Sequence, residues 1–439
     1  MARPSAVVGI GQTDYRRQLD VTLDGLVRWA ALEALEDAGM TFADIDAIVI
    51  GKAPDALEAV MMPELSLADA LGAVGKPIHR VHTAGSVGAS TAITGATLVE
   101  SGRYERVLVV CYEKQSEGNA TWALSGGRSG GQGAGGTFAP WIRSYISRSG
   151  APEHIGWKIA VKDRLNALKN PHAHLRIDDI SIEKVKESPM LWDPLHFLES
   201  CPSSDGAAAV VLASEDVARR SPRPPAWVVA HAKRTEFSSF PGRDTVRPVA
   251  GVDCAEALYA KAGITDPLRQ IDCAELYVPF SWYEPMWLEG HLITPEGEGW
   301  KLTDAGETEL GGGFPVNPSG GVLSSNPIGA SGLIRCLEAA NQVRGTAGAY
   351  QVDERSGDAE RSGARQHHVG QPAEFGSGLA LHPQRHAEAG DLRRCRRAFH
   401  DLVHRPPGLI CGERLPLDER ADQRGPGGAG IHGVPLTGG

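Results

Sequence analysis

The 439-residue sequence lacks several features that would place it in a specialised class of protein. No apolar run approaches the ~20 residues that a membrane-spanning helix requires, and glycine, glutamine and aspartate interrupt the first apolar run, unlike in a signal peptide. Its seven cysteines are odd in number and scattered, and none has C-x-x-C spacing. We therefore expect neither a disulfide framework nor a metal site, and we predict a cytoplasmic protein with reduced thiols.

Positive charge is also in the minority. The chain has 44 lysines and arginines but 54 aspartates and glutamates, and its formal net charge is −10. This balance argues against a nucleic-acid partner, which would require a basic surface. The composition is 41% hydrophobic and 22% charged, as in an ordinary soluble globular protein. The length suffices for roughly three domains at ~150 residues each.

Two pairs of segments resemble each other in the same order along the chain. Residues 33–46 and 255–272 each read as a helix ending in Ala-Gly, followed by Thr and then by Ile-Asp at the start of a strand. Residues 86–102 and 326–345 each carry Gly-Ala-Ser at a helix entrance and Gly beyond the helix end. Two matches in the same order predict a duplicated α/β unit.

Short apolar runs alternate with helical patterns, which predicts a mostly parallel sheet with helical crossovers. A long insertion at about residues 114–203 separates two of the core strands and is expected to cover a site. The predicted strands are Ala6–Gly11, Ile45–Gly51, Arg106–Glu113, Ala207–Ala213, Trp227–Ala232 and Cys273–Tyr277, and the predicted helices are Leu23–Ala38, Gly88–Ser101, Ala255–Ala262 and Gly329–Val343.

The segment 350–439 departs from this pattern. It contains no lysine but 12 arginines, 15 glycines, 7 prolines and 7 of the 15 histidines, and no sustained apolar periodicity. We therefore expect that it buries no core, either because the reading frame changes near residue 353 or because it is a natural disordered tail. Resequencing the gene across that codon distinguishes the two. The predicted units are residues 1–222, 223–349 and the anomalous 350–439.

Four blocks of sequence carry a family resemblance over about residues 5–349. They are VVGIGQTDY, EHIGWKIAVKDRLNALKNPHAH, SDGAAAVVLASE and GGFPVNPSGGVLSSNPIGASG. Together they resemble the thiolase superfamily, specifically its branch of lipid-transfer-protein (sterol-carrier) thiolases. The resemblance implies a five-layered αβαβα fold made of two similar halves, usually a homodimer. It also implies that coenzyme A thioesters are the substrates and that no cofactor is permanently bound.

The residues that perform acyl transfer in the resembled family differ in this chain. Ser86, in S-V-G-A, stands where the family has its nucleophilic cysteine, and Asn326, in S-N-P-I-G, replaces a histidine. Tyr277 opens the block Y-V-P-F, where the family has Asn-Glu-Ala-Phe or His-Asp-x-Phe. The second cysteine, in a C-terminal Cys-x-Gly, is not found. Because serine is a far weaker nucleophile than a thiolate, ordinary thiolysis is not expected.

The substituted residues still allow another reaction of CoA thioesters. Ser86 and Asn326 each precede a helix, where backbone N–H groups favour negative charge. We expect the two helix starts to meet and to hold a thioester enolate, with Tyr277 as the acid or base. Retro-aldol cleavage of a β-hydroxyacyl-CoA needs no covalent acyl-enzyme. Cysteine-free members of the resembled branch are associated with such cleavage of steroid side chains, together with a small OB-fold, zinc-ribbon partner.

Five further residues are candidates for binding the substrate or CoA: Gly88, Asn317, Ser319, Gly320 and Gly329. The loop N-P-S-G-G (residues 317–321) reads as a turn whose glycines allow a ligand to approach the backbone, and in the family this loop borders the catalytic pocket.

Three glutamates flank the block that Tyr277 opens. Glu275 is expected to orient the site, and Glu284 and Glu289 to be solvated helix residues.

Simpler roles and other functions remain open. Ser86 and Asn326 are also typical helix caps, and Tyr277 is also a typical strand-packing residue. Besides the lyase, the sequence is compatible with an acetyl-CoA acyltransferase that uses an activated Ser86. It is equally compatible with a non-catalytic protein that binds or transfers lipid-CoA.

Overall fold

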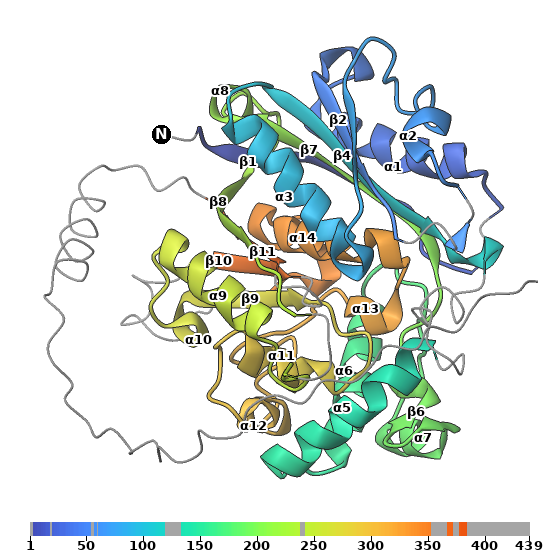
Figure 1. Cartoon of the computed structure of the whole chain (residues 1–439), viewed down its shortest axis with the longest axis vertical. Coiled ribbons are helices and arrows are strands. Elements are labelled where there is room, and N and C mark those ends of the chain that lie inside the picture. Colours follow the sequence, from blue (N-terminus) through green and yellow to red (C-terminus); the bar gives the residue numbers. More distant parts are fainter. Residues whose placement is uncertain are drawn as a thin grey trace, which may run out of the picture. The chain divides into compact units, whose positions relative to one another are not determined.

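Two successive copies of one strand-helix pattern organise the chain (Figure 1). The structure is a computed structural model that describes residues 3–17, 20–53, 57–58, 60–118, 133–237, 242–352, 367–371 and 377–383. The first copy contains β1 (Ser5–Gln12), α1 (Leu23–Ala38), β2 (Ala47–Gly51), α2 (Pro63–Ser66), β3 (Ile78–Val81), α3 (Val87–Glu100), β4 (Arg106–Lys114), α5 (Gly133–Ser149), α6 (His154–Ala167), α7 (Ile182–Glu187), β5 (Met190–Trp192), β6 (Leu195–His196), β7 (Asp205–Ser214) and α8 (Glu215–Ala218).

The second copy repeats the pattern with shorter connections. It contains β8 (Ala226–Lys233), α9 (Val249–Ala262), α10 (Pro267–Gln270), β9 (Ile271–Leu276), α11 (Tyr283–Gly290), α12 (Gly299–Asp304), α13 (Gly321–Ser324), α14 (Ile328–Arg344), β10 (His367–Gln371) and β11 (Ser377–His382). All ten strands and helices expected from the sequence are present. The largest difference in bounds is at α9, which begins at Val249 rather than at Ala255.

The strand order shows the duplication directly. The order is β3-β2-β4-β7-β1 in the first half and β9-β10-β11-β8 in the second, and the halves join where β1 pairs with β8. In the place of a counterpart to β3, the second half has an isolated parallel bridge between Ala274 and Val316. The helices α1 and α9, and likewise α3 and α14, occupy equivalent positions in the two halves. The predicted duplication is confirmed.

The prediction of a mostly parallel sheet is wrong, because most pairs of neighbouring strands are antiparallel. The pairs β2–β3, β2–β4 and β9–β10 are parallel, whereas β1–β7, β4–β7, β1–β8, β8–β11 and β10–β11 are antiparallel. The reason is that β7 and β11 each lie between two strands of their half and are antiparallel to both. Their apolar runs resemble those of parallel strands because helices cover both faces of the sheet.

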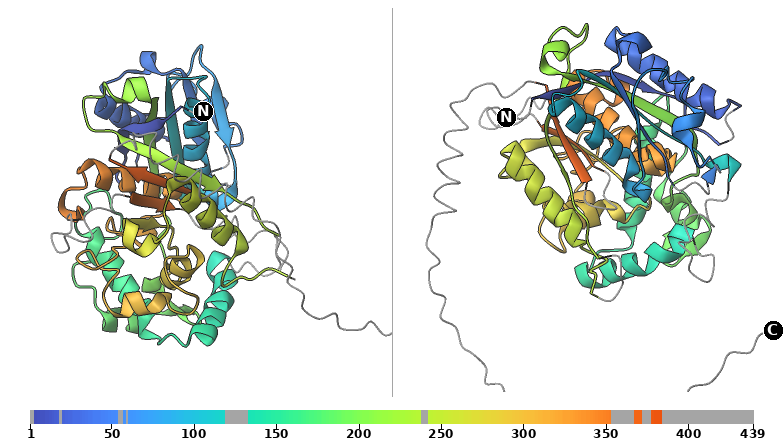
Figure 2. Two further views of the ribbon diagram at one scale, coloured as in Figure 1. Left: turned by 90° about the vertical axis from the view of Figure 1, so that its left-hand side faces the viewer. Right: turned by 45° about the horizontal axis from the view of Figure 1, so that its top comes forward.

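Three apolar cores separate the layers. One packs α1 against the outer face of the first half's strands, and a second contains α3 and α14 together with strands of both halves. The third packs α9, α11, α5 and α6 against strands of the second half. Figure 2 shows α3 and α14 side by side between the strands. The five-layered αβαβα fold is therefore confirmed.

The tail contributes more to this fold than its composition predicts. The strand β11 lies between β8 and β10, and its residues Leu379, Ala380 and Leu381 are fully or almost fully buried. The expectation that nothing after residue 350 buries a core is wrong for this strand, because a run as short as S-G-L-A-L-H shows no extended periodicity. Residues 384–439 lie outside the described part, and the change of reading frame remains a prediction.

A truncation series tests this role of the tail. We expect a chain ending at residue 349 to lose cooperative unfolding, because β8 and β9 would no longer be bridged by β10 and β11. A chain ending at residue 385 should keep it. Denaturant unfolding followed by circular dichroism distinguishes the two, and a cooperative transition in the shorter chain would show that these strands are dispensable.

The contact between α3 and α14 yields a second prediction. A Cβ atom on Gly88 would lie 2.7 Å from the Cα atom of Gly332. We expect Gly88→Ala to lower the free energy of unfolding by about 1–3 kcal/mol, because the helices must move apart. The control is Gly251→Ala in α9, where the nearest atom would be 3.8 Å away. Equal stability of the two variants in denaturant titrations would exclude a close contact at Gly88.

Candidate functional site

Ser86 lies at the turn that leads into α3. The residues Ala84–Ser86 form a 3-10 turn that packs against α14, and Ala84 has a φ of 49°. Ser86 is 1% exposed, and its hydroxyl donates to the Thr83 carbonyl at 2.8 Å, with the Thr83 hydroxyl 3.1 Å away. A carbonyl and a hydroxyl are not bases, so this serine is not activated as a nucleophile. Its side chain does not cap α3 either.

Asn326 is held by groups from the loop before β7 and from α14. Its backbone N–H donates to the hydroxyl of Ser204 at 3.1 Å. Its side-chain carbonyl accepts from Ser331 at 2.7 Å, and its side-chain amide donates to the Cys201 sulfur at 3.1 Å. The cap of α14 is Pro327. Asn326 is therefore a fixed side-chain amide beside the start of α14, where the sequence analysis expected a group that binds the thioester oxygen.

Tyr277 directly follows β9 and is 2% exposed. Its carbonyl accepts from the indole N–H of Trp287 at 2.8 Å. The loop after it pairs with the segment before β7, since the Cys201 N–H donates to the Pro279 carbonyl at 3.0 Å. Cys201 thus contacts both the loop of Tyr277 and the side chain of Asn326.

The starts of α3 and α14 meet as predicted, because Gly88 of α3 lies against Gly332 of α14. Cys201 is not among the residues predicted from the sequence. The only signal for it was its place in C-P-S-S-D-G, just before the strand β7.

The predicted binding loop of residues 317–321 is committed to protein contacts. Asn317 has a φ of 54°, and its side-chain carbonyl accepts from the Leu276 N–H at 2.7 Å. Ser319 donates to Glu275 through both its hydroxyl (2.8 Å) and its N–H (3.0 Å). A Cβ on Gly320 would lie 2.7 Å from the Cα of Ala167 in α6. The close backbone approach at this glycine is therefore to α6, where we had expected a ligand.

The other two predicted binding glycines also face protein atoms. Gly88 lies against α14, as described above. A Cβ on Gly329 would lie 2.7 Å from the backbone nitrogen of Ala53 and 2.6 Å from the Glu113 carboxylate. Burial is the main cause that raises the pKa of Glu113 well above its usual value, and a hydrogen bond with Glu58 adds to it. Both glycines therefore serve close packing at helix α3 or α14.

A buried network of charged residues holds the loop of residues 317–321 in place. Arg335 of α14 pairs with Glu275 and donates to the Ser319 hydroxyl at 2.9 Å. Burial raises the pKa of Glu275, and the positive charge of Arg335 opposes this shift. Glu338, one turn further along α14, accepts from Tyr350 at 2.7 Å. Glu275 therefore positions the loop, and its expected role in orienting the site remains a prediction.

The helix α6, part of the insertion expected to cover a site, carries buried charges that pair with groups of the second half. Lys162 pairs with Glu284 and donates to the Val316 carbonyl at 2.9 Å. Glu284 also accepts from Thr303 at 3.0 Å. Glu289 accepts from the Tyr145 hydroxyl at 2.7 Å. The expectation that these two glutamates are solvated is wrong, because α11 is covered on all sides and each carboxylate has a partner there.

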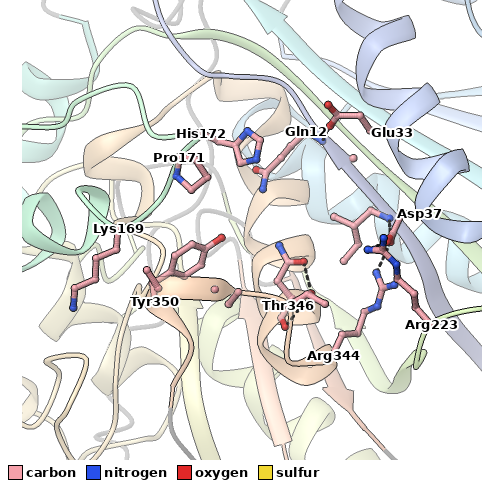
Figure 3. Close-up of a pocket in the computed structure, with 16 residues that line it drawn as sticks. Gln12, Glu33, Asp37, Lys169, Pro171, His172, Arg223, Arg344, Thr346 and Tyr350 are labelled. Atoms are coloured by element: carbon pink, nitrogen blue, oxygen red, sulfur yellow. Dashed lines mark hydrogen bonds and ion pairs between the residues drawn. The ribbon is translucent and has the colours of Figure 1, made fainter.

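A polar cavity of about 390 Å³ lies at the opposite end of α14 (Figure 3). Its carboxylates are already occupied, since Asp37 pairs with Arg344 and Arg223 at 2.6 Å each and Glu33 accepts from the Gln12 N–H at 3.1 Å. None of the three predicted catalytic residues lines this cavity. We therefore treat it as separate from the candidate site.

Two classes of site find no support in the described residues. They contain no group of three or more histidines, cysteines, aspartates or glutamates arranged to hold a metal ion. They also contain no helix that is both long and apolar enough to cross a membrane.

The buried Asp163 next to Lys162 predicts a pH dependence of stability. Burial is the main cause that raises the pKa of Asp163 to about 7, and the Glu284 carboxylate adds to it, whereas Lys162 lowers it. The native state therefore binds a proton that the unfolded chain releases near its ordinary pKa of 3.8, and stability falls as the pH rises from about 4 to about 7 and then levels off.

We expect Asp163→Asn to raise the free energy of unfolding by about 1–3 kcal/mol more at pH 8 than at pH 5. The control is Asp178→Asn at an exposed position, whose pH profile should match that of the wild type. Urea titrations at both pH values measure the effect, and parallel profiles for all three proteins would refute it.

Comparisons with known proteins fit this geometry. The family described as thiolase C-terminal domain-like matches residues 233–366. The chain is 31% identical over 362 residues to the acetyl-CoA acetyltransferase of Methanothermobacter thermautotrophicus, covering 80% of this chain and 94% of that protein. It is 29% identical to the steroid side-chain-cleaving aldolase of Thermomonospora curvata (78% and 90% covered) and to human sterol carrier protein 2 (79% and 67%).

Solved structures give the same result. The Ltp2-ChsH2(DUF35) aldolase superposes with a TM-score of 0.73 at 28% identity, covering 87% of this chain and 98% of that chain. Human mitochondrial 3-ketoacyl-CoA thiolase superposes with a TM-score of 0.62 at 15% identity, covering 86% and 98%, which shows the fold alone. The duplicated fold, the meeting helix starts and these similarities together establish that the chain belongs to the thiolase family.

Proposed function

We propose that the protein is a lyase that cleaves the Cα–Cβ bond of a β-hydroxyacyl-CoA by a retro-aldol reaction, with a steroid or another bulky lipid as the acyl chain. The observation that carries this proposal is the hydrogen bonding of Ser86. Its hydroxyl donates to a main-chain carbonyl, so covalent acyl transfer has no activated nucleophile at this position. The similarity to the steroid side-chain-cleaving aldolase supports the same reaction class.

In the proposed reaction, Tyr277 acts as its phenolate and removes the proton of the β-hydroxyl group. The electron pair of the breaking Cα–Cβ bond moves into the thioester and forms an enolate, while the β-carbon leaves as a ketone. The enolate oxygen lies at the starts of α3 and α14, where backbone N–H groups and the Asn326 amide stabilise negative charge. Protonation of Cα gives the shortened acyl-CoA. One proton leaves oxygen and one reaches carbon, so the reaction balances without a permanent cofactor.

Two other functions have some support. Acyl transfer between an acyl-CoA and CoA is favoured by the 31% identity to an acetyl-CoA acetyltransferase. It predicts an acylated Ser86, which mass spectrometry would detect. Binding or transfer of lipid-CoA without catalysis is favoured by the similarity to sterol carrier protein 2. It predicts stoichiometric binding of acyl-CoA without turnover.

We also propose a homodimer that forms across the edge strand β3. This strand ends the sheet, and three nearby side chains, Met61, Met62 and Leu65, are 70%, 60% and 71% exposed. Exposed apolar side chains beside an unpaired strand edge are typical of an interface.

A small OB-fold, zinc-ribbon protein is a second proposed partner, supported by the two-component description of the Ltp2-ChsH2(DUF35) aldolase. The scattered cysteines without C-x-x-C spacing support the proposed cytoplasmic location.

The proposal predicts that Tyr277→Phe lowers kcat for cleavage by about 10²-fold or more, because the variant has no hydroxyl to transfer the proton. The assay is mass-spectrometric detection of the ketone and the shortened acyl-CoA from a steroid β-hydroxyacyl-CoA, with and without the candidate partner. Tyr104→Phe, at a half-buried position on the loop before β4, is the matched control. Full activity of Tyr277→Phe would overturn the assigned role.

A further inference from the structure

Cys201 differs from the other cysteines that the structure describes. Cys111, Cys254, Cys273 and Cys336 are buried within strands or helices, whereas Cys201 is half-buried in the loop before β7. Burial raises the pKa of the Cys111, Cys254 and Cys336 thiols to about 12, so these thiols are inert at neutral pH.

Two other segments of the chain surround Cys201 in these contacts, residues 326–331 and the loop of Tyr277. The Asn326 side-chain amide donates to its sulfur at 3.1 Å, and Ser331 fixes that amide from the other side at 2.7 Å. The backbone N–H of Cys201 is bound to the loop of Tyr277 through the Pro279 carbonyl. The sulfur therefore lies in the site itself, next to the amide proposed to hold the thioester oxygen.

A buried positive charge lies beside this thiol. Arg164 of α6 is 1% exposed and donates to three main-chain carbonyls, those of Leu323, Leu198 and Ser200, the last of which directly precedes Cys201. Its Nε atom has no hydrogen-bond partner. Asp163 and, after it, Cys201 contribute to the electrostatic surroundings of this guanidinium. A buried guanidinium beside a thiol favours the negatively charged form of that thiol, the thiolate.

We propose that Cys201 is a catalytic residue that protonates the enolate carbon. This inference rests on the proposed function and adds a second proton-transfer group to it. After Tyr277 has taken the hydroxyl proton and the Cα–Cβ bond has broken, the Cys201 S–H bond breaks and its proton forms the new Cα–H bond. The sulfur is left as a thiolate, stabilised by the Asn326 amide and by Arg164. Proton return from Tyr277 to the sulfur, directly or through water, restores both groups.

The first test places Cys201 in the acyl-CoA site without relying on turnover. The full-length protein is treated with iodoacetamide at pH 7, and alkylated peptides are quantified with and without saturating octanoyl-CoA. We expect Cys201 to be alkylated first and octanoyl-CoA to slow its alkylation by about 10-fold or more, because a thiol covered by a bound ligand is inaccessible. Absence of protection by octanoyl-CoA would overturn the assignment, even if the wild-type protein cleaves substrate.

The second test separates a catalytic role from a structural one. We expect Cys201→Ala to lower kcat by about 10²-fold while KM changes little, and Cys201→Ser to recover only part of kcat, because a hydroxyl is a weaker acid than a thiol. In D2O, the remaining product should still carry one deuterium at Cα. The control is Cys254→Ala in α9, whose thiol contacts the Ala232 carbonyl and no predicted site residue.

These outcomes distinguish the two proposals. Wild-type kcat in Cys201→Ala refutes the catalytic role and leaves the lyase intact. Protection by octanoyl-CoA in a wild-type protein that cleaves no β-hydroxyacyl-CoA refutes the lyase and supports the place of Cys201 in the acyl-CoA site.

Discussion

The close approach of α3 and α14 is the constraint on which the rest of the structure depends. Gly88 allows the backbones of the two helices to meet at Gly332, in the apolar core that contains strands of both halves. Because the two helices occupy equivalent places in the two copies, their N-terminal ends come to the same region. The partial positive charge of two helix ends thereby lies in one region, and under the proposed function it would stabilise a thioester enolate.

Buried charges hold the second half of this site in place. Glu275, Arg335 and Ser319 fix the loop of residues 317–321, and Lys162 of α6 reaches the backbone at Val316 just before it. Because these ions are paired and hydrogen-bonded inside the protein, losing one partner would leave an uncompensated charge. The loop is thus a rigid support for the neighbouring residues. The groups left for chemistry are those at the helix starts and after β9.

Periodicity and repeats predicted the strands and helices of both halves, because long apolar runs and helix-ending glycines are local signals. They did not predict β11, whose apolar run is too short, or the antiparallel direction of β7, which depends on where the strand enters the sheet. Motif position identified Ser86, Asn326 and Tyr277 as candidates. It could not show that Gly320 of the loop packs against α6, or that Cys201 reaches Asn326, since both contacts join residues more than 100 positions apart.

The central claim is carbon–carbon cleavage without a covalent acyl-enzyme. The most direct measurement follows the intact mass of the protein and the small products together while a steroid β-hydroxyacyl-CoA is consumed. The account predicts a ketone and a shortened acyl-CoA in equal amounts, with the protein mass unchanged throughout. An increase in protein mass by the acyl group, mapped to Ser86 or to Cys201, would contradict it and establish acyl transfer instead.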